Sequence, residues 1–64
     1  MTALERRYAM ECCDQIEARL RALIEVLRYA ETPQEAAAGS MARAAQALIE
    51  GISQQLILSD TDEK

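Results

Sequence analysis

Thr32-Pro33-Gln34-Glu35, near the middle of the chain, is the stretch that decides the fold. A threonine hydroxyl can accept a hydrogen bond from the backbone N–H three residues on, and a proline at the first helical position loses no hydrogen bond. Glu35 completes a capping box with Thr32, so a helix is predicted to begin at about residue 33. Because Pro33 disfavours helical geometry in the residue before it, an earlier helix should end just short of it. The stretch therefore predicts the turn of a helical hairpin, at about residues 31–33.

The chain before this turn predicts one long helix over about residues 3–30. Thr2-Ala3-Leu4-Glu5 repeats the capping-box pattern and marks the start of this helix. Apolar residues then recur at alternating steps of four and three, which is typical of the seam between two packed helices. Ile24 widens this predicted seam, which consists of Ala9, Cys13, Ile16, Leu20, Leu23, Leu27 and Ala30. We expect Leu20, Leu23 and Leu27 to pack against the second helix.

The second helix is predicted over about residues 33–58. Gly39-Ser40 could break it and restart it at Ser40, but the capping box at Thr32 favours a continuous helix. The last residues, 59–64, are polar and mostly acidic, which predicts a frayed tail. With Ala42 beside it, the seam predicted to face the first helix consists of Ala38, Met41, Ala45, Leu48, Ile49, Ile52 and Leu56.

A second stripe on this helix consists almost entirely of small residues. Small side chains let another backbone approach closely, whereas alanine-rich sequence is also simply good helix-forming sequence, and both readings stay open. Gly51 costs up to ~1 kcal/mol against alanine in a helix, so close packing would be a reason for it. The predicted partner-binding residues are Ala36, Ser40, Ala44, Ala47, Gly51 and Leu58 on this stripe, with Leu4 and Tyr8 on the first helix.

Catalytic and ligand-binding chemistry finds no support in the residues. The sequence has no histidine, the commonest general base and metal ligand. Cys12 and Cys13 are adjacent, so they point about 100° apart on a helix and form no metal-ligand pair. Gly39 and Gly51 are isolated and form no phosphate loop. We therefore expect no enzyme, no metal site and no cofactor.

Composition also restricts the compartment and the partners. The chain has 64 residues, a net charge of −4 and no block of lysine or arginine, which weighs against nucleic acid or an anionic membrane surface. No apolar run approaches the ~18 residues of a membrane span, and the start lacks a signal-peptide pattern. Adjacent free thiols fit a reducing compartment, so a cytoplasmic protein is predicted.

The sequence thus predicts an all-α protein with a single domain, an antiparallel two-helix hairpin of coiled-coil type. A lone hairpin of this size buries little apolar surface, so we expect it either to self-associate into a dimer or bundle or to dock on another protein. The predicted function class is protein–protein interaction.

One family resemblance narrows this class. The chain opens with Met1-Thr2-Ala3-Leu4-Glu5, has a helix–turn–helix length, and contains Ala47-Leu48-Ile49-Glu50-Gly51-Ile52 followed by glutamine and leucine. In these features it resembles the small co-chaperones of type III secretion needle subunits, the YscE/PscE-type family. The resemblance implies a cytosolic hairpin of a bacterial virulence system that joins a larger tetratricopeptide-like chaperone. Together the two hold the needle subunit soluble before export.

The alternative is a Rop-like hairpin, which dimerises into a four-helix bundle and binds paired RNA loops. Such an RNA face needs basic side chains collected on one surface. The arginines of the first helix are instead interleaved with acidic residues. We therefore rank this alternative below the co-chaperone.

Overall fold

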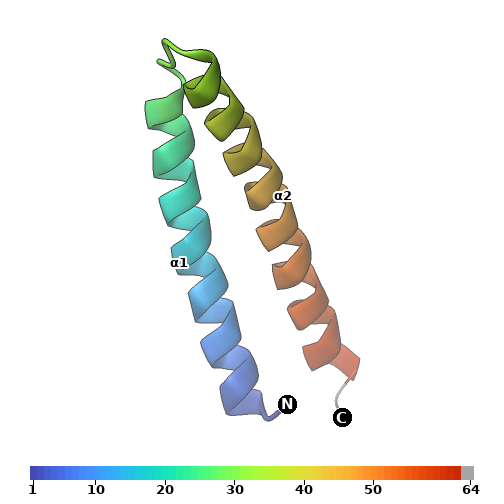
Figure 1. The fold of residues 1–64 in the computed structure, drawn as a ribbon. Coiled ribbons are helices and arrows are strands. Elements are labelled where there is room, and N and C mark those ends of the chain that lie inside the picture. Colours follow the sequence, from blue (N-terminus) through green and yellow to red (C-terminus); the bar gives the residue numbers. More distant parts are fainter. Residues whose placement is uncertain (63–64) are drawn as a thin grey trace.

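The computed structural model describes the backbone of residues 1–62 and the side chains of residues 1–59. Over this range the chain forms two helices and no strand: α1, Ala3–Leu27, and α2, Pro33–Asp62. The helices run antiparallel, side by side, and residues 28–32 connect them at one end of the hairpin (Figure 1). The predicted all-α antiparallel hairpin is confirmed.

Both helices begin with the capping boxes that the sequence predicts. At α1 the Glu5 N–H donates to Thr2 Oγ1 over 3.1 Å, and the Thr2 N–H donates to Glu5 Oε1 over 2.8 Å. At α2 the Glu35 N–H donates to Thr32 Oγ1 over 3.1 Å. Glu35 Oε1 in turn accepts from the N–H groups of Glu31 and Thr32 over 2.9 and 3.0 Å. These boxes satisfy backbone donors that would otherwise lack partners at the two helix starts.

The same hydrogen bonds shift the titration of both capping carboxylates. The N–H groups of Glu31 and Thr32 lower the pKa of Glu35, because they favour the charged carboxylate. The pKa of Glu5 is lowered in the same way, first by the Thr2 N–H and then by the Thr2 hydroxyl. Both helix starts therefore prefer an ionised glutamate.

The helix ends differ from the predicted ones. α1 ends at Leu27 rather than at about residue 30, because the chain needs residues 28–32 to reverse direction before Pro33. α2 continues to Asp62, so the predicted frayed tail is wrong for residues 59–62, whereas residues 63 and 64 lie outside the described range. That stretch contains no glycine or proline to stop a helix. The predicted continuity through Gly39-Ser40 is confirmed.

The interface between α1 and α2, here called the seam, is narrow. Its residues are buried or half-buried and recur at steps of three and four, as in a coiled coil. Among the described residues, only Cys13 and Ala42 are buried apolar side chains, 6% and 5% exposed, and they lie at different levels of the seam. The seam residues are Arg6, Met10, Cys13, Glu17, Leu20, Ile24 and Leu27 on α1, and Gly39, Ala42, Gln46, Ile49, Ser53 and Leu56 on α2.

Gly39 fixes the register between the two helices. A Cβ atom built on this buried glycine would lie 3.5 Å from Leu27 Cβ, so the two residues face each other just below the turn. Because the helices are antiparallel, residue numbers fall along α1 and rise along α2 as both are followed away from the turn. This register places Leu20 opposite Gln46 and Cys13 opposite Ser53.

Part of the predicted seam is wrong. Cys13, Leu20, Leu27, Ile49 and Leu56 lie in the seam as expected, and Ala9 and Ala45 are half-buried beside it. Seven further predicted residues are exposed: Ile16, Leu23, Ala30, Ala38, Met41, Leu48 and Ile52. The seam instead accepts polar residues, and on α2 the most apolar row is not the row that faces α1.

Candidate protein-binding surface

The misplaced apolar residues gather on one side of the hairpin. In a helix each residue is rotated by about 100° from the one before it. Residues that directly precede seam positions therefore flank the seam on one side, and in an antiparallel pair this is the same side for both helices. Ile16 and Leu23 of α1 precede the seam residues Glu17 and Ile24, and Ile52 of α2 precedes Ser53.

We call this side the apolar face. On α2 the flanking row continues toward the open end of the hairpin with Gln55, which precedes the seam residue Leu56, and then with Ser59. On both helices the face keeps the alternating three- and four-residue spacing of a packing surface. The residues of the apolar face are Ala9, Cys12, Ile16, Arg19, Leu23 and Val26 on α1, and Ala38, Met41, Ala45, Leu48 and Ile52 on α2.

Within the described chain, the large side chains of the apolar face stay about half to three-quarters accessible. Six of them are between 45% and 72% exposed: Ile16, Leu23, Val26, Met41, Leu48 and Ile52. Among the residues named, Arg19 is the only charged one, and Glu5, which precedes the seam residue Arg6, continues the row at the open end of the hairpin. Apolar side chains grouped on one side of two helices differ from the scattered apolar residues of an ordinary surface, so this face is a candidate interaction site.

The opposite side, here called the charged face, has mixed charges. Arg21 of this face pairs with the carboxylate of the seam residue Glu17, and within the face Arg28 Nη1 lies 3.5 Å from Glu25 Oε1. Acidic and basic residues are equal in number on this face, so it offers no basic surface to a phosphate backbone. Its charged residues are Arg7, Glu11, Asp14, Arg21, Glu25, Arg28, Arg43 and Glu50.

The predicted stripe of small residues is exposed, on the outer side of α2 away from α1. All of its predicted partner-binding residues are accessible: Ala36, Ser40, Ala44, Ala47, Gly51 and Leu58. A Cβ atom built on Gly51 would meet no atom within 4 Å, so nothing in the hairpin requires a glycine there. Docking on this stripe stays a prediction.

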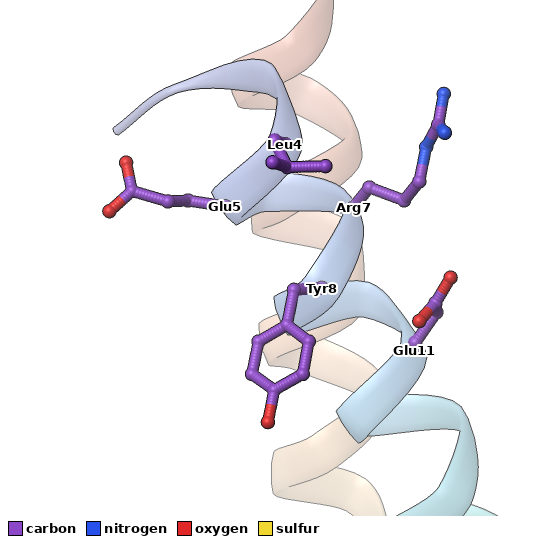
Figure 2. A pocket seen from close by; sticks show the side chains of 5 residues that line it. All are labelled: Leu4, Glu5, Arg7, Tyr8 and Glu11. Atoms are coloured by element: carbon purple, nitrogen blue, oxygen red, sulfur yellow. The ribbon is translucent and has the colours of Figure 1, made fainter.

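The remaining two predicted residues, Leu4 and Tyr8, lie near the start of α1 and are exposed. With Glu5, Arg7 and Glu11 they line an open depression on the helix surface, and Figure 2 shows that all five side chains come from α1. The depression lies between neighbouring side chains of one helix rather than between elements. It has no converging polar groups that would orient a small ligand.

The two thiols occupy different environments. Cys13 is buried in the seam and Cys12 is half-buried on the apolar face, and both are free. Among the described residues, no group of three or more cysteine, aspartate or glutamate side chains could hold a metal ion. Within the same range, neither helix combines the length and the apolar character needed to cross a membrane.

Sequence reasoning missed the apolar face because it assigned these residues to the hairpin interior. A signal for the face was present in α2, where two adjacent rows both follow the three–four spacing. One row contains Met41, Leu48 and Ile52, and the other contains Ala42, Ile49 and Leu56.

Compared with protein-family models, with curated proteins and with solved structures, the chain matches none of them.

Proposed function

We propose that this protein is a non-catalytic interaction module that docks on a larger helical protein through its apolar face. The observation that supports this proposal is the set of large apolar side chains left exposed on one side of the hairpin. Burying such a side chain contributes about 1.5–3 kcal/mol when it is fully removed from water. A partner that covers the face therefore gains affinity from residues that contribute little to the isolated hairpin.

The limited apolar packing in the seam also favours binding to a partner. Three of the seam positions on α2 are Gly39, Gln46 and Ser53, which add almost no apolar contact with α1. A hairpin of 64 residues with such a seam has a small margin of stability. Because a ligand that binds only the folded form stabilises that form, docking would also stabilise the hairpin itself.

For the partner we propose a tetratricopeptide-like chaperone of a bacterial type III secretion system, with the needle subunit as the protein that the complex keeps soluble. The resemblance of the chain to cytosolic co-chaperones of such subunits supports this choice. The three–four spacing of the apolar face also fits a partner built from helices, since helices offer matching ridges and grooves. The mixed charges of the charged face favour protein over RNA as the partner.

A pair of neighbouring substitutions tests where docking occurs. Leu48 lies on the apolar face and Ala47 on the small-residue stripe, and both are exposed, so neither change removes a contact within the seam. Leu48→Glu places a charge in the proposed interface. We expect a cost of about 2 kcal/mol, or a roughly 30-fold loss of affinity for the chaperone in calorimetry. Arg21→Ala on the charged face is the control, with affinity close to wild type.

The same experiment examines the stripe. If Ala47→Leu weakens the complex and Leu48→Glu does not, docking uses the small-residue stripe and the apolar face is not the docking surface. Overpacking a close helix contact costs about 1–3 kcal/mol, so this effect would be readily measured. Failure of the wild-type protein to bind the co-expressed chaperone, with RNA recovered instead, would contradict the proposed function.

A further inference from the structure

We propose that, in the absence of a partner, two copies of this chain pair through their apolar faces and form a four-helix bundle. The fold leaves the large apolar side chains of this face exposed. The inference uses the same surface as the docking proposal but does not depend on it. It concerns the purified chain alone.

The size of the face agrees with that of a stable dimer. Along its two longest principal axes the hairpin extends 51 by 15 Å, which corresponds to a footprint of about 765 Å². A standard protein interface buries ~800 Å² on each partner. The hairpin can therefore form an interface of ordinary size only if the face is used over its whole length, as a second hairpin of the same length would do.

The distribution of side-chain size along the face is suited to pairing with itself. The register places Ile16, Leu48 and Ile52 together near the middle of the hairpin, and Leu23 and Met41 somewhat closer to the turn. An alanine lies at each end of the face, Ala9 near the open end and Ala38 next to the turn, where Val26 is the one larger residue. A two-fold axis would therefore bring the bulky middle of one copy onto the bulky middle of the other.

The charge distribution also favours a second copy. In an interface between identical surfaces every charge occurs twice, so a face with several charges of one sign repels its own copy. The apolar face carries Arg19, whose long side chain can reach water at the rim, and Glu5 at its open end, whose carboxylate accepts from the Thr2 N–H in the helix cap. Charged residues concentrate on the opposite side, which would become the outer surface of the bundle. The spacing of three and four residues matches the packing of left-handed four-helix bundles.

The proposed dimer makes a prediction about the complex. Because both would use the apolar face, the dimer must separate before a chaperone can dock there. The complex should therefore contain one copy of this chain for each chaperone. Self-association would keep the apolar face covered until the partner is available.

Analytical ultracentrifugation of the purified chain at micromolar concentration tests the inference. The expected mass is about 14 kDa, twice the 7.1 kDa of one chain. Thermal unfolding followed by circular dichroism should show a midpoint that rises with protein concentration, as mass action requires of a dimer. A mass of one chain at all concentrations, a midpoint independent of concentration, or an assembly larger than two chains would overturn the proposal.

Two leucines on α2 provide a matched pair of variants. Leu48→Glu on the apolar face should convert the dimer to a monomer, whereas Leu58→Glu on the outer side should leave the dimer intact. Mixing Leu48→Glu with Leu48→Lys should restore a dimer, because the axis brings the middles of the two faces together. If Leu58→Glu separates the chains and Leu48→Glu does not, the pairing surface is the outer side of α2 and the inference is wrong.

Discussion

Replacing Gly51 with alanine should stabilise this protein, although the position looked on sequence grounds like a site of close contact. Gly51 lies well inside α2, far from both of its ends, and is exposed. A Cβ atom there would meet no atom within 4 Å, so the substitution creates no clash. Alanine is also less flexible than glycine in the unfolded chain. The expected gain is therefore the full difference in helix propensity, about 0.8–1 kcal/mol.

The size of this effect is measurable in so small a protein. One kcal/mol shifts the unfolding midpoint of a domain of this length by roughly 4–8 °C. Thermal unfolding of wild type and Gly51→Ala by circular dichroism, at equal concentration, should show a rise within this range. Gly39→Ala is a useful companion, because its Cβ would lie 3.5 Å from Leu27 Cβ, an ordinary contact, and should stabilise to a similar extent. Gly39→Leu should destabilise by about 1–3 kcal/mol, since a large side chain would separate the helices.

The outcome also bears on the small-residue stripe. An unchanged or lower midpoint for Gly51→Ala would refute the reasoning, because it would mean that the outer side of α2 is packed against something in solution. If the variant is more stable alone but binds the chaperone less tightly, the stripe is a contact surface in the complex. Equal binding would leave the apolar face as the docking surface.

Three further predictions concern the helix start, the seam and the thiols. Capping hydrogen bonds hold the pKa of Glu35 below its ordinary value of 4.5. The contribution of the ionised Glu35 to stability is therefore present above pH 4.5 and is lost as the pH falls through the lowered pKa. Glu35→Gln keeps a hydrogen-bond acceptor at this position but does not titrate. The helicity of this variant should therefore fall less in acid than that of wild type, and an equal fall would contradict the role of Glu35 as a capping carboxylate. In the seam, Ile49→Ala should cost about 2 kcal/mol in urea unfolding, at the low end for such a change because the site is only half-buried. Leu58→Ala, on the exposed side of α2, should change the free energy of unfolding by no more than about 0.5 kcal/mol. Equal losses of stability for Ile49→Ala and Leu58→Ala would mean that the seam is misassigned. Cys13→Ser should cost about 1 kcal/mol in the same assay because it buries a hydroxyl, and Cys12→Ser should cost less; the reverse order would contradict the burial of Cys13.

The sequence by itself determined the local structure of this protein. Thr32-Pro33 and the glutamate that follows specify where one helix stops and the next begins, since capping and proline geometry act over only a few residues. The same holds for the start at Thr2. The end of α1 was predicted less well, because the number of residues needed to reverse the chain depends on how close the two helices lie.

Only the tertiary structure decided which side of each helix faces the other. The apolar residues of α2 cover two adjacent rows, and helical periodicity does not choose between rows that are one residue apart. The connection over residues 28–32 holds the helices together at the turn, where Gly39 and Ala42 are small enough for the backbones to approach. This close approach selects the row with the small residues for the seam. The bulkier row, which contains Met41, Leu48 and Ile52, is left exposed on the surface.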